Sequence, residues 1–219
     1  MLIPVFNGEK YLAEAIESVL NQTFKGFELI IVDDGSTDNT GIIAESYPSV
    51  HYIRKQHSGV SDSRNTAVKN ANGEWIVFLD ADDILMPHAL EKEMAFLSSH
   101  QECDILFCGC RNFTDLPEGQ LTERQKVLLS AEMDNIIPGA CIRKDLFEKY
   151  GDFDTKYHYG EDTEWNARLK FQGVDFSCCL DEVLYLRRIH NDNISLGHKT
   201  PGKREYLSLM ATAIRNRKR

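Results

Sequence analysis

The sequence predicts an α/β fold, with a mostly parallel central sheet flanked by helices. Over residues 1–110, short apolar segments alternate with segments whose apolar residues recur at helical spacing, which is typical of βαβ units. Residues 28–33 (ELIIVD) are almost continuously apolar, as in a strand that is buried on both faces. Carboxylates directly follow two of the apolar segments. Because ligands of such sheets bind at the carboxyl ends of the strands, we expect a site at that edge.

Strands and helices alternate regularly in the first half of the chain. The predicted strands are residues 2–6, 28–33, 50–55, 74–80 and 104–110. The predicted helices are residues 9–22, 40–47, 60–71 and 87–99. The first helix has an apolar face formed by Leu12, Ala15, Ile16, Val19 and Leu20, as helical periodicity requires.

After residue 110 the alternation becomes irregular, and residues 111–135 begin as a polar segment. Residues 143–151 and 160–173 predict two helices, each with a glycine at its end, which is a common helix terminator. Residues 174–180 and 183–189 predict two further strands near the edge of the sheet.

Composition and length are those of a globular protein with one core. The chain has 219 residues, of which 42% are hydrophobic and 27% charged, enough for a single α/β domain. No repeat or low-complexity linker divides it. We predict one domain over residues 1–199, with halves 1–110 and 111–199, followed by a basic helix over 200–219. The net charge of -9 argues against non-specific binding of nucleic acid.

The sequence predicts a cytoplasmic protein. Its six cysteines form no CxxC pair, so we interpret them as buried thiols in a reducing compartment. No apolar run approaches the ~20 residues needed to span a membrane, and no signal peptide is evident. The first strand is already under way at residue 2, so we expect a few natural residues before it and a longer tail behind.

The basic C-terminal segment has two open interpretations. Leu207, Met210 and Ile214 share one helical face opposite several lysines and arginines. Such a helix could lie at the inner face of the membrane as a peripheral contact. It could equally dock on the domain with its charges exposed.

The segment WIVFLDADDILMP places Asp80, Asp82 and Asp83 after a buried-looking strand. Neighbouring carboxylates repel one another and are costly to desolvate unless a cation or strong donors compensate. Two aspartates at i and i+2 can bind one hard cation through oxygen. The alternative is that Asp82 and Asp83 cap the helix predicted to begin near Pro87.

Three other positions carry a functional and a structural interpretation. In VDDGSTDNT, Asp33 and Asp34 could shape a turn, or one could accept a hydrogen bond from a nucleobase N–H. In GEDTEWNARL, Glu161 and Asp162 could simply favour the helix dipole, or supply a general base. His190 follows a strand and could be a structural hydrogen-bonding group or a metal ligand.

Several nucleotide-binding and hydrolase motifs are absent from the sequence. It has no GxGxxG, no P-loop GK[ST] and no GxSxG, which excludes the dinucleotide-binding, P-loop and α/β-hydrolase patterns. Haloacid-dehalogenase phosphatases also carry DxD after an apolar strand. Theirs lies on the first strand, whereas this one lies on the fourth predicted strand.

In order, IPVFNGEKYLAEAIESVLNQTF, ELIIVDDGSTDNT, GVSDSRNTAVKNANGEWIVFLDADDILMPHALE and GEDTEWNARL resemble family 2 glycosyltransferases with the GT-A fold. The resemblance extends from residue 2 to about residue 195. It implies a nucleotide-binding half, residues 1–110, and an acceptor-side half, residues 111–199. DAD resembles the DxD motif of the family, which holds Mn²⁺ or Mg²⁺ against the diphosphate of a nucleotide-sugar.

The resemblance implies a role for each nucleotide-binding position. Pro4 and Val5 would line the nucleoside site, and Asp34 would accept from the base. Arg64 resembles the basic residue that approaches the base or the phosphates. Asp80 would lie near the ribose and the metal. The DSRN sequence around Arg64 departs from the ARN or KN of many members, without touching a catalytic position.

The remaining roles concern the cation and the chemistry. Asp82 would be the direct metal ligand, and His190 would supply a third ligand or a diphosphate contact. Asp162 resembles the base that deprotonates the acceptor hydroxyl. The resemblance therefore implies an inverting, metal-dependent transfer from a UDP-sugar to a glycan or lipid-linked acceptor, in cell-surface polysaccharide synthesis. The alternatives are a GT-A-like binding module without turnover, or a sugar-1-phosphate nucleotidyltransferase, whose glycine-rich basic loop PVFNGEKYL lacks.

Overall fold

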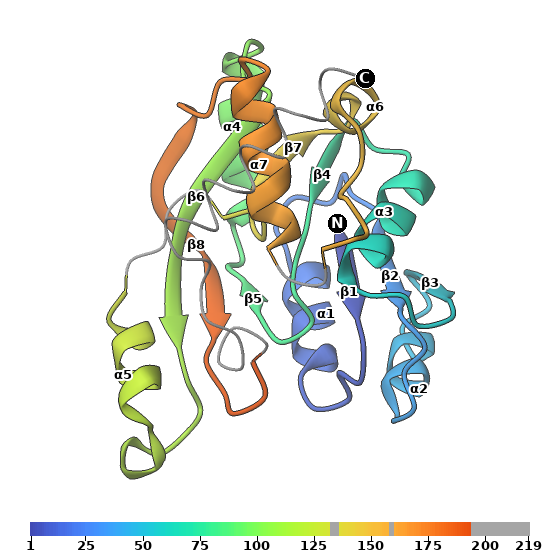
Figure 1. Cartoon of the computed structure of the whole chain (residues 1–219), viewed down its shortest axis with the longest axis vertical. Helices are drawn as coiled ribbons and strands as arrows, with labels where there is room; N and C mark the ends of the chain where they lie inside the picture. The colour runs from blue at the N-terminus through green and yellow to red at the C-terminus, as the bar shows by residue number, and fades with distance from the viewer. Residues whose placement is uncertain (132–135, 158–159, 194–219) are drawn as a thin grey trace.

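The structure is a computed structural model that describes residues 1–131, 136–157 and 160–193. Its first sheet is parallel, with the order β1-β2-β3 (Figure 1). These strands are Leu2–Val5, Leu29–Asp33 and Val50–Arg54. Every residue of β1 and β2 is buried, which explains why their sequences are apolar with so little interruption.

Three helices pack with the parallel sheet, and they lie with it in the right-hand part of the molecule in Figure 1. They are α1, α2 and α3, covering Leu12–Leu20, Thr40–Glu45 and Val60–Asn70. Alternate residues of β1 and β2 enter two separate apolar clusters, so that Ile3 packs with α1 whereas Leu2 packs with α3. The parallel sheet therefore has a hydrophobic core on each of its faces.

A second, mixed sheet has the order β4-β7-β6-β8-β5. Its strands are Trp75–Val77, Ile84–Leu85, Ile105–Phe113, Cys141–Arg143 and Cys179–Arg188, numbered β4 to β8 along the chain. β6 and β8 are parallel, whereas β4–β7, β6–β7 and β5–β8 are antiparallel. Phe78 forms parallel bridges with Leu2 and Pro138, which connects the two sheets.

The other helices accompany the mixed sheet and its loops. They are α4 (Ala89–Ser99), η1 (Glu118–Gln120), α5 (Glu123–Leu129), α6 (Asp145–Tyr150) and α7 (Glu161–Phe171). In Figure 1, α7 lies in front of the mixed sheet, and α5 projects from the body of the molecule. Among the described residues, none of the helices has the length and apolar character that crossing a membrane requires.

The α/β fold and its parallel sheet confirm the sequence prediction, but the second half differs in detail. The two strands predicted over 174–180 and 183–189 are one strand, β8. Leu180 pairs with Cys108 and Val183 with Gly109, so the two acidic residues between them bulge out of the ladder. This bulge is the apparent break in the sequence pattern. The short strands β5 and β7 and the antiparallel pairs were not predicted.

The cysteines form no disulfide, and all six lie in the described part of the chain. Four are buried, Cys178 is half-buried and Cys179 is exposed, so the prediction of buried thiols holds for four of them. The predicted basic helix over 200–219, and the domain end at residue 199, lie outside the described residues.

Candidate active site

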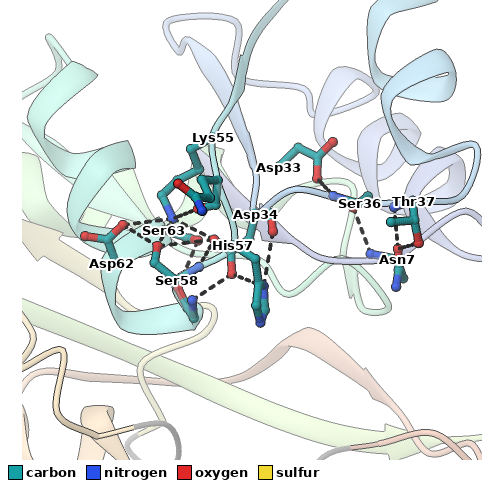
Figure 2. A network of polar contacts seen from close by, with 12 residues as sticks. Asn7, Asp33, Asp34, Ser36, Thr37, Lys55, His57, Ser58, Asp62 and Ser63 are labelled. Carbon is teal, nitrogen blue, oxygen red and sulfur yellow. Dashed lines mark hydrogen bonds and ion pairs between the residues drawn. The ribbon is translucent and has the colours of Figure 1, made fainter.

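The loops that follow β1 and β2 are braced against each other (Figure 2). Asn7 has a positive φ of 52°, and its side-chain oxygen accepts from Thr37 N at 2.8 Å. Asn7 N donates to Ser36 Oγ at 2.8 Å. The buried carboxylate of Asp33 accepts from Ser36 N at 2.7 Å and from Tyr52 Oη at 2.6 Å. Asp33 therefore shapes the turn, as its structural interpretation required.

Asp34 is buried at the end of β2, and its carboxylate holds the loop after β3. Lys55 Nζ lies 2.6 Å from Oδ1, and the backbone N–H groups of Ser58 and Gly59 donate at 2.9 and 2.7 Å. His57 Nδ1 lies 2.8 Å from Oδ2. Burial alone would raise the pKa of Asp34, but hydrogen bonds from Lys55 and the two backbone N–H groups hold it below its usual value.

The carboxylate oxygens of Asp34 thus already have internal hydrogen-bond donors. The predicted contact of Asp34 with a base N–H stays a prediction. Among those donors His57 has a largely exposed side chain, 59% accessible. Lys55 was missed by sequence reasoning, although its place at the end of β3 obeys the same strand-end rule as Asp34.

At the end of β1, the side chains of Pro4 and Val5 are buried, and Val5 packs in the core. Val5 O accepts from Asp34 N at 2.8 Å, which brings the ends of β1 and β2 together. The accessible group at this position is Phe6, 48% exposed, whose ring centroid lies 4.3 Å from that of His57. The lining role of Pro4 and Val5 stays a prediction.

Arg64, on α3, joins two of the acidic motifs. Its Nη2 lies 3.1 Å from Asp80 Oδ1 and its Nη1 lies 2.5 Å from Glu161 Oε1. The Arg64 side chain is 5% exposed, so it presents little surface to a ligand. Burial raises the pKa of Glu161, although Arg64 opposes that shift. The sequence motif offered Glu161 and Asp162 together, and the resemblance gave a role to Asp162 alone.

Asp162 lies in the first turn of α7, directly after Glu161. Gly160 before the helix has a positive φ of 78°, a conformation that glycine adopts without strain. Asp162 Oδ1 accepts from Thr163 N at 2.6 Å. Whereas Glu161 is 6% exposed, Asp162 is only partly buried. Asp162 is therefore the more accessible carboxylate of this pair.

Asp82 and His190 meet although they are far apart in the sequence. His190 Nε2 lies 2.8 Å from Asp82 Oδ2, and Asn193 Nδ2 lies 3.3 Å from the same oxygen. Asp82 follows β4, and His190 follows β8. Within the described ranges, no three His, Cys, Asp or Glu side chains form a ready metal cluster. The pair offers one oxygen and one nitrogen ligand, and further ligands would come from a bound molecule.

The order of these motifs along the chain agrees with a known family. The model of glycosyl transferase family 2 matches residues 1–151, which is more than half of the chain. The chain belongs to glycosyltransferase family 2. The α/β architecture described above is accordingly a GT-A fold.

Relatives of this glycosyltransferase come from several bacteria. An uncharacterized glycosyltransferase of Rickettsia typhi is 32% identical over 87% of this chain and 64% of its own length. The minor teichoic acid biosynthesis protein GgaB of Bacillus subtilis is 34% identical over 89% of this chain and 23% of its own. This chain thus spans less than two thirds of the length of these relatives.

Solved structures share the fold of this glycosyltransferase. S. aureus TarS residues 1–349, in complex with UDP-GlcNAc, has a TM-score of 0.76 at 24% identity. The match covers 97% of this chain and 65% of that one. At this identity the likeness shows the GT-A fold alone.

Asp83, next to the Asp82 of this glycosyltransferase, is a structural residue. It is 3% exposed, accepts from Tyr185 Oη and accepts from Arg188 N at 2.7 Å. Burial, and then the nearby Asp82, raise the pKa of Asp83 well above its usual value. The helix-capping interpretation of Asp82 and Asp83 is wrong, because α4 begins at Ala89 with His88 as its N-cap.

Arg188, at the end of β8, supports the turn that carries Asp82. Its Nε donates to Asp82 O at 2.9 Å, its Nη2 lies 2.5 Å from Glu14 Oε2, and its Nη1 pairs with Asp115. The guanidinium lies 4.6 and 4.5 Å from the ring centroids of Tyr11 and Phe113. These contacts fix the Asp82 turn against α1 and β6. No sequence pattern indicates this role of Arg188, because its partners lie up to 174 positions away along the chain.

Proposed function

We propose that this glycosyltransferase transfers a sugar, with inversion, from a UDP-sugar to a hydroxyl group of a glycan or lipid-linked acceptor. The observation that carries the proposal is the Asp82–His190 contact of 2.8 Å, beside Asp80 at the carboxyl ends of the strands. Asp162 lies at the start of α7, and its charge acts on the same Arg64 that Asp80 and Glu161 contact. The carboxylates that we assign to the donor side (Asp80) and to the acceptor side (Asp162) both act on this one guanidinium, which supports the proposal.

The comparisons support the substrate classes in this proposal. The TarS structure was solved with UDP-GlcNAc, and the name of GgaB places that relative in teichoic acid biosynthesis. A UDP-sugar donor and an acceptor in cell-surface polysaccharide synthesis are the corresponding proposals for this chain.

The residues present fit a divalent cation, Mn²⁺ or Mg²⁺. Asp82 and His190 would hold it, with Asp80 close by, and phosphate oxygens would complete its coordination, because such ions bind proteins through one or two carboxylates. When bound, the cation would neutralise the negative charge that develops on the nucleoside-diphosphate leaving group.

The protein's own groups would perform the remaining steps. Asp162 would accept the proton of the acceptor hydroxyl as that oxygen attacks the anomeric carbon. The attack proceeds from the face opposite the diphosphate, so the configuration inverts. Asp34, with the loop that it holds, would place the nucleoside at the end of β2.

The first prediction is that UDP binding requires a divalent cation, because the diphosphate and the Asp80–Asp82 carboxylates repel each other without one. Calorimetric titration of UDP and UDP-sugars with Mn²⁺, and again with EDTA, measures this directly. We expect affinity with Mn²⁺ and little or none with EDTA. Equal affinity in both would contradict the metal dependence.

Turnover is a separate measurement. A panel of UDP-sugars with Mn²⁺ should release UDP slowly by hydrolysis, and faster once a suitable acceptor hydroxyl is added. Cation-dependent binding without any UDP release from the panel would indicate a nucleotide-sugar-binding module in place of an enzyme.

A further inference from the structure

Hydrogen bonds join α3 to residues 153–157, which precede α7 in the chain. Asn65 Nδ2 donates to Phe153 O at 2.8 Å, and Phe153 N donates back to Asn65 Oδ1 at 2.9 Å. Ser61 Oγ donates to Tyr157 O at 2.7 Å. These bonds join residues 88 to 96 positions apart. The start of α7 is therefore placed by α3 as well as by its own sequence.

Arg64 is the contact of α3 that reaches both sides of the site. One arm of its guanidinium holds Asp80 and the other holds Glu161. The guanidinium also lies 5.6 and 5.7 Å from the ring centroids of Phe78 and Phe153. A planar guanidinium presents its donors in a fixed geometry, so it sets the spacing between the two carboxylates that it joins.

Two observations indicate that the contacts of Arg64 with Asp80 and Glu161 are structural, and that Arg64 does not bind a ligand. The Arg64 side chain is only 5% exposed, and both of its terminal nitrogens donate to carboxylates, Nη2 to Asp80 and Nη1 to Glu161. Glu161 is buried and faces Arg64, whereas the neighbouring Asp162 is accessible. On a helix, consecutive side chains point about 100° apart, so Glu161 can anchor the turn while Asp162 faces the substrate.

We propose that Arg64 and Glu161 form a clamp that positions the base: it fixes the first turn of α7, and with it Asp162, relative to Asp80 on the donor side. The proposal rests on the proposed function, because it takes Asp162 as the base. It assigns Arg64 to positioning and not to the nucleobase or phosphate contact that the resemblance implied. It also assigns Glu161 to positioning and not to proton transfer.

Steady-state kinetics on Glu161→Gln, Arg64→Lys and the double variant test the clamp. A buried hydrogen bond between charged groups is worth about ten- to a hundredfold, so each single variant should lower kcat by that factor. UDP affinity with Mn²⁺ should stay within about twofold. Because both residues act through one contact, the double variant should lose no more than about the larger single loss.

Glu164→Gln is the matched control for Glu161→Gln. Glu164 is also buried in α7, one turn later, and pairs with Arg168 at 2.9 Å, away from the clamp. It should change thermal stability without the drop in kcat. Multiplying losses in the double variant would overturn the clamp. So would a loss of UDP affinity in Arg64→Lys as large as its loss in kcat, which would make Arg64 a ligand contact.

Amide hydrogen exchange tests the same proposal without any substrate. Glu164 N donates to Gly160 O at 3.0 Å in the first closed turn of α7, so exchange over residues 164–169 reports the start of that helix. We expect faster exchange there in Arg64→Lys than in the wild type. Lys69→Met is the control, because Lys69 joins α3 to Asp152 through an exposed pair at 3.5 Å.

Unchanged exchange over 164–169 in Arg64→Lys would overturn the clamp whatever the enzyme's activity. A wild-type protein that shows cation-dependent UDP binding but no transfer would instead contradict the proposed function, and the exchange result would still stand. The two failures are therefore distinguishable.

Discussion

Adjacent carboxylates in the GED motif have different surroundings, and this separates their roles. Glu161 is buried against Arg64 at 2.5 Å, whereas Asp162 is partly exposed and accepts hydrogen bonds from its own neighbour, Thr163. A group that takes a proton from a substrate has to be within reach of it. Asp162 is the more accessible of the two, which is why we propose it as the base.

We predict that Asp162→Asn lowers turnover about 10²–10⁴-fold, the usual loss when a general base is removed. The amide keeps the shape of the side chain and can still accept from Thr163 N, so the fold and the cation-dependent UDP affinity should survive. Transfer kinetics beside calorimetric titration of UDP measure both quantities. Near-native turnover in Asp162→Asn would show that the base is another group.

At this scale the sequence predicted residues by chemical type and position, but not their internal partners. Asp82 and His190, both predicted metal ligands, do meet at 2.8 Å. In contrast, the partners of Asp34 and Arg64 were not predicted. Lys55 is 21 positions from Asp34, and Glu161 is 97 positions from Arg64. Spacing along the chain carries no information about such partners, because the tertiary fold brings them together.

Among the elements, β8 contributes most to the site after the parallel strands. Tyr185 is completely buried and holds Asp83 through its hydroxyl. Its ring packs against Gly139, where an added Cβ would lie 2.7 Å from Tyr185 Cδ2. Gly139 also has a positive φ of 82°. The segment before β7 can therefore approach β8 closely because residue 139 has no side chain.

We predict that Gly139→Ala destabilises the protein by about 2–5 kcal/mol, through strain at positive φ and overpacking against Tyr185. Gly173→Ala is the matched control, since Gly173 has φ of 85° but no atom within 4 Å of an added Cβ. It should cost about 1–2 kcal/mol from backbone strain alone. Urea unfolding measures both, and equal losses would mean that Tyr185 moves aside freely.

The elements of the first half were predictable, and those of the mixed sheet were less so. Strands β1 and β2 are buried throughout, so hydrophobicity alone marked them. β5 and β7 have two and three residues, too few for an alternating pattern to appear. α5 was hidden in the irregular segment after residue 110, although Thr122 and Gln125 form a capping box at its start.

At the scale of the whole molecule, Glu93 places an ionisable carboxyl group in the hydrophobic core. Its side chain, on α4, is fully buried, and neither carboxylate oxygen has a hydrogen-bond partner within the described residues. Burial raises the pKa of Glu93 well above its usual value. Burial, and next Glu93 itself, also raise the pKa of the Cys108 and Cys141 thiols. Burial therefore favours the protonated, uncharged form of Glu93 in the folded state.

This protonation makes stability depend on pH with a definite sign. In the unfolded chain Glu93 ionises near its ordinary pKa of about 4.3, while in the folded protein burial holds its pKa well above that value. The contribution of Glu93 to the free energy of unfolding is thus fully present below about pH 4.3. It is lost progressively as the pH rises toward and through the raised folded-state pKa.

We predict that Glu93→Met raises the free energy of unfolding at neutral pH by about 1–3 kcal/mol or more, because an unpaired buried polar group is removed. Its advantage over the wild type should grow as pH rises from about 5 to 8. Urea unfolding across this range measures the difference. The exposed Glu91→Gln on the same helix is the control, and a difference independent of pH would contradict the raised pKa of Glu93.

The position of β8 has a consequence for how the protein is made. β8 comes last among the described strands, yet it lies inside the mixed sheet, between β6 and β5. While a ribosome is still extending the chain, β6 has an unpaired edge along most of its length, which is a template for unwanted strand pairing. The Asp82 turn also lacks Arg188 and His190 until then. The nascent protein therefore stays prone to association, and its site stays unassembled, until about residue 190 has left the exit tunnel.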